Sequence, residues 1–145
     1  MPLRGRILGI DYGHRRVGLA ISDPSGRIAF PFQTIDRRKS PAPLEDQIAS
    51  IVQDHDIGKV VVGLPLTERG EKGTRALEVE SFITSLKRQI GCEVSSFDER
   101  FSSARAVKAL HEMGERTGDD KGRVDQISAT LILQNFLDRS NRDTC

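Results

Sequence analysis

The chain has 145 residues, of which 37% are hydrophobic and 30% charged, and its formal net charge is +1. This length fits one domain with a hydrophobic core of its own, and the near-zero charge argues against a protein that coats nucleic acid through general positive charge. The two cysteines, Cys92 and Cys145, imply no disulfide framework, which fits a reducing, cytoplasmic environment. We expect neither a signal peptide nor contact with a membrane, because the apolar runs are too short for either.

The first part of the chain predicts three strands, at 6–11, 17–22 and 26–34. A short turn at 12–16, rich in glycine and arginine, joins the first two strands. A second turn signal at 23–26 precedes the third. Because these links are short, we expect the three strands to form an antiparallel meander.

The rest of the chain alternates helices and strands. Leu44, Ile48 and Ile51 recur at helical spacing, and the continuous apolar run at 59–65 is typical of a parallel strand covered on both faces. The further predicted elements are a helix at 74–89 with core contacts at Leu77, Phe82, Ile83 and Leu86, a strand at 92–99, a helix at 102–113 with Ser102 as its N-cap, a mobile polar loop at 114–123 and a last helix at 123–138. This order predicts an α/β fold with a mixed five-stranded sheet and helices on both faces, in one domain over 1–139 with a short tail at 140–145.

Acidic residues stand where a site would form in such a sheet, outside the carboxyl ends of its strands. Asp11 ends the first strand, Asp98 and Glu99 end the fifth, and Asp125 lies in the first turn of the last helix on a mostly buried stripe. Each acid alone has an ordinary explanation as a turn former, a solvated charge or a favourable charge at a helix start. Strand alternation alone does not choose between Asp98 and Glu99.

Together, these carboxylates would be costly to bring into one pocket without compensation. Oxygen ligands without cysteine or histidine at zinc spacing favour Mg²⁺ or Mn²⁺. Such ions can activate a water and stabilise a leaving oxygen in phosphodiester cleavage. The sequence therefore predicts a metal-dependent nuclease.

Four motifs in the chain resemble, in order, those of the YqgF family of Holliday-junction-resolvase-like proteins. They are "GIDYGHRRVGLAISD", "VVGLP" followed by Gly70 and Gly73, "DERFSS" and "GRVDQISATLILQNFLD", and they cover about residues 5–139. The resemblance implies a ribonuclease H-like fold and a nuclease that trims the 5′ end of precursor 16S rRNA in the bacterial cytoplasm, with pre-ribosomal particles as partners. It also implies that Asp11, Glu99 and Asp125 are the catalytic acids and metal ligands. Two departures from the family pattern are Ser128 and the modest basic charge of the segment before Asp125.

Further residues near these motifs are candidates for contact with the substrate. They are Gly13, His14, Arg15, Arg16, Arg100, Lys121 and Arg123. Gly13 and Gly18 could provide a positive φ or a close backbone approach to phosphate, or simply form a hairpin. Arg100 could bind phosphate or order the acids, and we expect the charges at 36–39 to be ordinary loop charge. With one Tyr and no Trp, phosphate and metal contacts should dominate over base stacking.

Three alternatives remain open at this point. A resolvase acting on branched DNA would use the same acids, whereas a non-catalytic RNA-binding factor for ribosome assembly would need only the basic loops. An ATPase or sugar-kinase-like protein is a third alternative, because the turn after Asp11 also resembles the first phosphate loop of actin-like ATPases. Those enzymes need two such lobes, and the sequence shows one. The sequence does not distinguish RNA from DNA, or endonuclease from exonuclease action.

Overall fold

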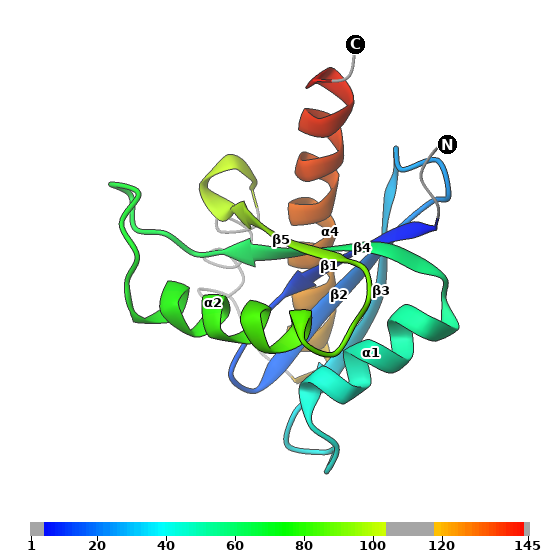
Figure 1. The fold of residues 1–145 in the computed structure, drawn as a ribbon. Helices are drawn as coiled ribbons and strands as arrows, with labels where there is room; N and C mark the ends of the chain where they lie inside the picture. Colours follow the sequence, from blue (N-terminus) through cyan, green and yellow to red (C-terminus); the bar gives the residue numbers. More distant parts are fainter. Residues whose placement is uncertain (1–4, 104–117, 144–145) are drawn as a thin grey trace.

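The computed structural model describes residues 5–103 and 118–143 (Figure 1). Its elements in chain order are β1 (Arg6–Asp11), β2 (Arg16–Ser22), β3 (Ala29–Asp36), α1 (Leu44–Asp54), β4 (Ile57–Leu64), α2 (Thr74–Lys87), β5 (Glu93–Asp98), the 3₁₀ helix η1 (Glu99–Phe101) and α4 (Gly118–Asp143). In this part of the chain, no helix is both long and apolar enough to span a membrane.

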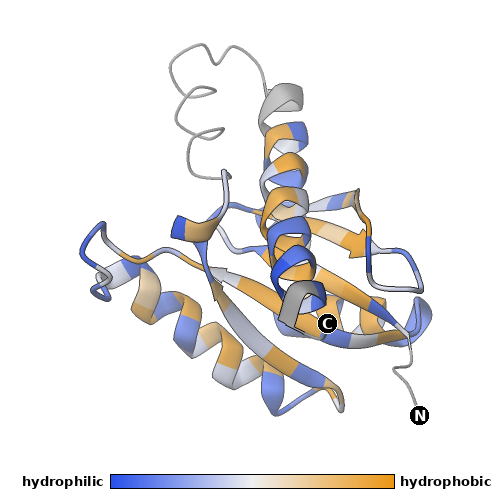
Figure 2. Cartoon of the chain, turned by 90° about the horizontal axis from the view of Figure 1, so that it is seen from above, coloured by the Kyte–Doolittle hydropathy of each residue, from blue (hydrophilic) through white to orange (hydrophobic). Residues whose placement is uncertain are grey.

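The five strands form one mixed sheet in the order β3-β2-β1-β4-β5. β2 pairs antiparallel with both β1 and β3, whereas β4 lies parallel to β1 and β5 lies parallel to β4. Helices α1 and α2 cover one face of the sheet and α4 covers the other (Figures 1 and 2). The predicted α/β fold with a mixed five-stranded sheet is therefore confirmed.

Each face of the sheet has its own hydrophobic core, because successive side chains of a strand point to opposite faces. The core under α1 and α2 includes Leu8, Ile10, Val17, Leu19, Val60, Val62, Ile48, Phe82 and Leu86. The core under α4 includes Ala20, Val61, Phe97, Ala129, Ile132, Leu133 and Leu137. In Figure 2, apolar segments of the central strands lie directly beneath α4.

The third strand is displaced from its predicted range of 26–34, because β3 begins at Ala29. The carboxylate of Asp23 accepts hydrogen bonds from the backbone N–H groups of Ser25, Arg27 and Ile28. These bonds hold the residues before Ala29 in a loop. The hydroxyl of Ser25 also donates to Asp23, and these bonds keep the pKa of its carboxyl well below the usual range.

The last helix is longer than the predicted 123–138, because α4 begins at Gly118 and continues through 140–143, where we expected a tail. The hydroxyl of Thr34 donates to the backbone carbonyl of Gly122 at 2.7 Å. This contact with β3 helps to hold as helix a glycine-containing segment that the sequence suggests is a loop. The predicted helix at 102–113 and loop at 114–117 lie outside the described residues, apart from Ser102 and Ser103. The N–H of Ser102 donates to the carbonyl of Glu99 at 3.1 Å, which closes η1.

One predicted core contact of α2 is wrong. Leu77 is 54% exposed, and the helix buries Ala76 and Val79 there instead, together with the predicted Phe82, Ile83 and Leu86. The 3.6-residue period of a helix allows either stripe, and the packing against β4 and β5 selects the one that contains Ala76.

Candidate active site

Asp11 lies at the carboxyl end of β1 on the face of the sheet that α4 covers. Two residues earlier on the same face, a Cβ atom added to Gly9 would lie 2.8 Å from the Cβ of Leu133 in α4. Asp11 is only 4% exposed. A buried carboxylate at this point is costly unless its charge is compensated, so its surroundings decide what it can do.

Asp125 in α4 lies against the residue that pairs with Asp11 in the sheet. Gly18 of β2 is the Cα partner of Asp11. A Cβ atom added to Gly18 would lie 2.0 Å from the backbone oxygen of Asp125 and 2.9 Å from its Cβ. The close approach of α4 therefore requires glycine at this position. Gly18 does not have a positive φ, so this contact, and not an unusual backbone conformation, explains it.

Glu99 lies on the other side of Asp11, against Gly63 of β4. The register pairs Ile10 with Val62, which places Gly63 beside Asp11 in the parallel ladder. A Cβ atom added to Gly63 would lie 2.8 Å from Oε2 of Glu99. Glu99 is 4% exposed, like Asp11. Two glycines thus flank Asp11, and each leaves the space that a second acid occupies.

Asp98 and Glu99 point to opposite faces of the sheet. Phe97 packs in the core under α4, so the side chain of Asp98 points toward the α2 face and Glu99 returns to the α4 face. Asp98 accepts a hydrogen bond from the backbone N–H of Arg100 at 2.9 Å, which caps η1. Of the two acids that the sequence left as alternatives, the structure brings Glu99 to the side of Asp11.

Asp125 is held by an ion pair with Arg16, the first residue of β2. The Nε atom of Arg16 donates to Oδ2 of Asp125 at 2.8 Å, and both side chains are half-buried. This pair connects the end of the β1–β2 turn to α4. Arg16, which we expected to contact substrate, contacts one of the candidate acids in this structure.

The three acids approach the same end of β1 without forming a ready-made metal site. Across residues 5–103 and 118–143, no group of three or more His, Cys, Asp or Glu side chains is arranged to hold a metal ion. The donor types do fit a hard divalent cation, because all three are carboxylates. A Cβ atom on Gly18 would clash with Asp125, and one on Gly63 would clash with Glu99. The two glycines therefore allow these acids to lie here. Asp11, Glu99 and Asp125 are therefore the residues that would hold such an ion.

The other residues of the first turn make contacts within the protein. The Nε2 atom of His14 lies 2.6 Å from Oε1 of Glu78 in α2. The Nε atom of Arg15 lies 4.0 Å from Oδ2 of Asp36. A Cβ atom added to Gly13 would lie 2.3 Å from the backbone oxygen of Arg16, so this glycine permits a tight hairpin. Of the two candidates in α4, Arg123 is exposed, and the side chain of Lys121 lies outside the described residues.

Arg100 connects the end of β5 to the loop that follows β4. Its guanidinium donates to both carboxylate oxygens of Asp98, at 2.7 to 3.1 Å, and to the backbone oxygen of Glu68 at 3.3 Å. It lies over Gly70, where an added Cβ would be 3.2 Å from two of its nitrogens. The hydrogen bonds with Asp98 raise the pKa of Arg100. In this structure Arg100 therefore pairs with Asp98 and orders the loop beside Glu99.

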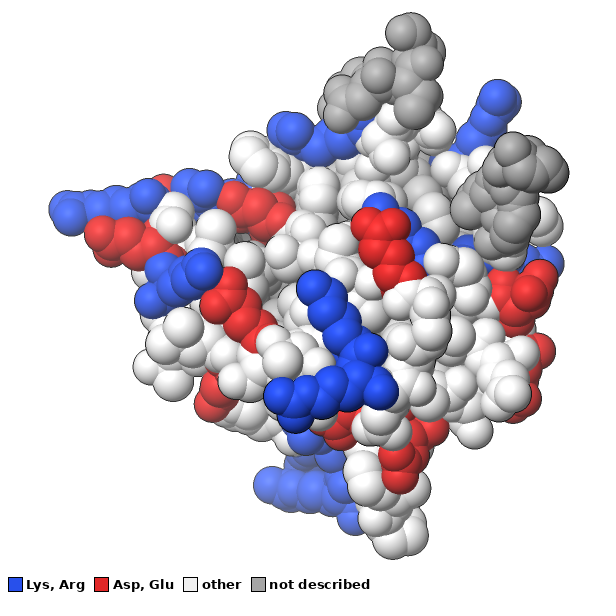
Figure 3. All heavy atoms as spheres, in the orientation of Figure 1, with Lys and Arg blue, Asp and Glu red and all other residues white. Residues whose placement is uncertain are grey.

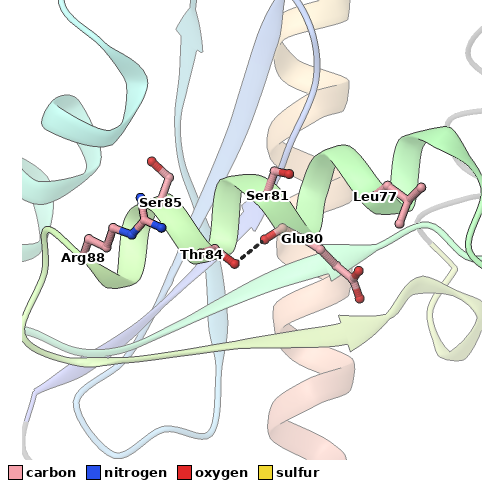
Figure 4. A pocket seen from close by; sticks show the side chains of 6 residues that line it. All are labelled: Leu77, Glu80, Ser81, Thr84, Ser85 and Arg88. Atoms are coloured by element: carbon pink, nitrogen blue, oxygen red, sulfur yellow. Dashed lines mark hydrogen bonds between the residues drawn. The ribbon is translucent and has the colours of Figure 1, made fainter.

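Two hollows on the surface of the described residues lie away from these acids. One, of about 430 Å³, runs along the outer surface of α2 between Leu77 and Arg88 (Figure 4). Another, of about 730 Å³, lies between the β1–β2 turn and α2 and is lined by Tyr12, Arg37 and Glu78 among others. Neither contains any of the three acids.

Gly63 is the residue of this site to which the sequence pattern assigned no role. The signal was present, because a glycine inside an otherwise apolar strand often marks a close approach by another part of the chain. What the pattern does not contain is the identity of the group that approaches.

The RuvX family, described as Holliday junction resolvase, matches residues 5–139 of the chain. A relative from Chloroflexus aurantiacus, named "Putative pre-16S rRNA nuclease", is 44% identical over 137 residues, which cover 93% of this chain and 89% of the relative. A relative of the same name from Nocardia farcinica is 41% identical over 143 residues, covering 94% of this chain and 79% of the relative.

Among solved structures, RuvC of Thermus thermophilus in complex with a Holliday junction substrate resembles the chain with a TM-score of 0.54 at 12% identity. The match covers 94% of this chain and 96% of RuvC. At this level of identity, the likeness shows a shared fold, which is the ribonuclease H-like fold expected from the motifs.

Proposed function

The chain belongs to the RuvX family, and we propose on that premise that it is a divalent-metal-dependent nuclease that processes the 5′ end of precursor 16S rRNA. The observation that carries the proposal is the placement of Asp11 between Gly18 and Gly63, with Asp125 against the first glycine and Glu99 against the second. The relatives named for this activity support the substrate. We place the activity in the cytoplasm, on pre-ribosomal particles.

The burial of the acids suits this chemistry. Hydrolysis of a phosphodiester needs an activated water and a stabilised leaving oxygen, and a divalent cation bound by carboxylates supplies both. Asp11 and Glu99, each 4% exposed, are held rigidly by β1 and by the start of η1. A rigid, largely water-excluded carboxylate keeps its position relative to the scissile phosphate, which lowers the entropic cost of alignment.

Asp125 differs from the other two acids because it comes from a helix and is paired with Arg16. Ligating carboxylates are commonly oriented by a second hydrogen-bonding partner. We propose that Arg16 has this role for Asp125 and keeps its carboxylate at the cleft.

The test compares Asp11→Asn with Asp54→Asn, a change at an exposed acid of α1 that removes the same charge. The substrate is a 5′-labelled RNA that carries the precursor extension of 16S rRNA, with Mg²⁺ or Mn²⁺ present. Asp11→Asn should reduce cleavage by roughly a hundredfold or more, the scale expected when a group that stabilises transition-state charge is lost. Asp54→Asn should cleave like the wild type.

A second measurement does not depend on turnover. Titration calorimetry with Mn²⁺ should show binding to the wild type and to Asp54→Asn, and markedly weaker binding to Asp11→Asn. Equal cleavage by all three proteins would refute the proposed mechanism. Binding of RNA that survives in Asp11→Asn, with no cleavage by the wild type under any metal, would instead favour a non-catalytic assembly factor.

Branched DNA is the second candidate substrate, because the matching family is described as Holliday junction resolvase. A synthetic four-way junction tested in parallel with the RNA decides between the two. Cleavage of the junction at a rate well above that of the RNA would replace the RNA proposal, and would leave the roles of the acids unchanged.

A further inference from the structure

Two turns at the edge of the molecule are joined into one unit. The turn after β1, at 12–16, meets the turn after β3, at 36–39, through Arg37. Its backbone N–H donates to the carbonyl of Arg15 at 2.7 Å, and its Nη1 donates to the carbonyl of Gly13 at 3.0 Å. Its guanidinium also lies 5.1 Å from the ring centroid of Tyr12. Figure 1 shows both turns at the lower side of the molecule.

These joined turns carry a local concentration of positive charge, which we name the hairpin ridge. Its basic members are Arg15, Arg16, Arg37, Arg38 and Lys39. The one acid within the two turns, Asp36, accepts a hydrogen bond from the backbone N–H of Arg38 at 3.0 Å, and lies 4.0 Å from Nε of Arg15. In Figure 3, which has the same orientation as Figure 1, basic and acidic side chains are interspersed over much of the face.

The members of the ridge divide into two groups. Arg37 and Arg16 are half-buried and are engaged within the protein, by the contacts of the two turns and by Asp125. Arg15, Arg38 and Lys39 are exposed. Arg38 and Lys39 have no carboxylate within ion-pair distance among the residues that the structure describes. Arg37 and Arg38 also line the hollow on the α2 side of the ridge, together with Glu45 and Glu78, so acidic side chains bound the positive charge on that side.

The ridge lies beside the candidate active site. Asp11 directly precedes the first turn, and Arg16, which ends that turn, pairs with Asp125. The register of β2 with β3 sets Arg16 opposite Asp36, so the second turn is one strand away from the acids. A strand of nucleic acid that presents a phosphate to Asp11 therefore lies next to the first turn, to which the second turn is hydrogen-bonded.

We propose that the hairpin ridge binds the sugar–phosphate backbone of the substrate strand next to the scissile bond, with Arg38 and Lys39 as its phosphate contacts. This inference rests on the proposed nuclease function. A chain with a net charge of +1 must concentrate its positive charge to hold a polyanion, and the ridge does so next to the acids. The guanidinium of Arg38 suits a phosphate oxygen pair, and Lys39 adds a point charge.

The test compares Arg38→Gln/Lys39→Gln with a distal variant, Arg27→Gln/Arg139→Gln. The control pair is exposed and removes the same charge. It lies at the other end of the strands, because Arg27 precedes β3 whereas the second turn follows it. The carbonyl of Arg27 accepts a hydrogen bond from Gln134, in the same half of α4 as Arg139.

Binding of a fluorescent 20-nucleotide single-stranded RNA is measured by anisotropy in EDTA at several salt concentrations. When the logarithm of the binding constant is plotted against the logarithm of the salt concentration, each phosphate contact to a single strand contributes about 0.7 to the slope. The ridge variant should therefore lose roughly 1.4 in slope and bind roughly tenfold more weakly at low salt. The distal variant should bind like the wild type, and thermal unfolding should be unchanged in both.

Equal slopes and affinities in the two double variants would overturn the inference, as would a wild type that binds neither this RNA nor the same DNA sequence. Failure of the proposed function has a different signature. In that case wild type and Asp11→Asn cleave alike, while the ridge variant still binds RNA more weakly than the distal variant.

Discussion

The two faces of the sheet are built from the same strands in opposite ways. Under α1 and α2, the central positions are large aliphatic residues with no exposure, such as Ile10, Leu19 and Val62. Their neighbours on the α4 face are Asp11, Gly18 and Gly63. In each of these strands, a large apolar residue on one face is thus adjacent in sequence to a glycine or an acid on the other face.

This difference separates stability from chemistry. The face under α1 and α2 stabilises the fold by burying apolar area, at about 25 cal/mol per Å². The α4 face gives up part of that gain so that a helix can lie close to the strands and acids can stand among them. The comparison implies that changes on the first face should lower stability more than activity, and that changes on the second should do the reverse.

The largest effect on stability is expected from Leu19→Ala. Leu19 is fully buried in the core under α1 and α2, and its truncation should lower the free energy of unfolding by about 2–5 kcal/mol. Cleavage per folded molecule, measured at a temperature where the variant is folded, should remain close to that of the wild type. Urea unfolding followed by circular dichroism gives the first quantity. A large loss of activity in fully folded Leu19→Ala would contradict the separation of the two faces.

A smaller loss of stability with a larger loss of activity is expected from Gly18→Ala. The new methyl group would meet the backbone of Asp125 at 2.0 Å, so α4 has to move. We expect about 1–3 kcal/mol of destabilisation from the overpacking, and about a hundredfold lower cleavage because an acid is displaced by the order of 1 Å.

Gly73→Ala is the matched control for this change, because an added Cβ there meets nothing within 4 Å. It should behave like the wild type in both unfolding and cleavage. Wild-type cleavage by Gly18→Ala would show that the position of Asp125 does not matter for the reaction.

Much of this organisation could be predicted from local sequence signals. The strand that ends at Asp11 is a continuous apolar run bounded by a turn, and β1 has the predicted bounds. The helix period also places Asp125 on the same stripe as Ser128 and Ile132, both of which are fully buried. Such features depend on residues close in sequence, whose pattern is strong when one face is buried.

The features that the sequence missed depend on contacts between distant parts of the chain. The sequence explains Gly18 by a positive φ, a close approach of phosphate or a hairpin, whereas its role comes from α4, more than a hundred residues later. The start of α4 at Gly118 is supported by a hydrogen bond from Thr34. The charges at 36–39 were interpreted as ordinary loop charge because nothing local shows that Arg37 joins them to the first turn. In each case the deciding partner is identified only by the three-dimensional fold.

The smallest effect on stability is expected from Arg100→Gln, at the boundary between the two faces. Arg100 and Asp98 form a partly exposed pair, with side chains 33% and 16% exposed, so its loss should change the free energy of unfolding by only about 0.2–1 kcal/mol. The hydrogen bond to Glu68 and the contact over Gly70 would also be lost, which should loosen the loop after β4. Trypsin should then cut after Arg69 and Lys72 faster than in the wild type, while unfolding by urea is nearly unchanged.

Cleavage of RNA should fall only several-fold, because Glu99 keeps its own contact with Gly63 and loses only the order of the neighbouring loop. A loss as large as that of Asp11→Asn would instead mean that Arg100 itself reaches the substrate, and that the boundary between the two faces lies beyond η1.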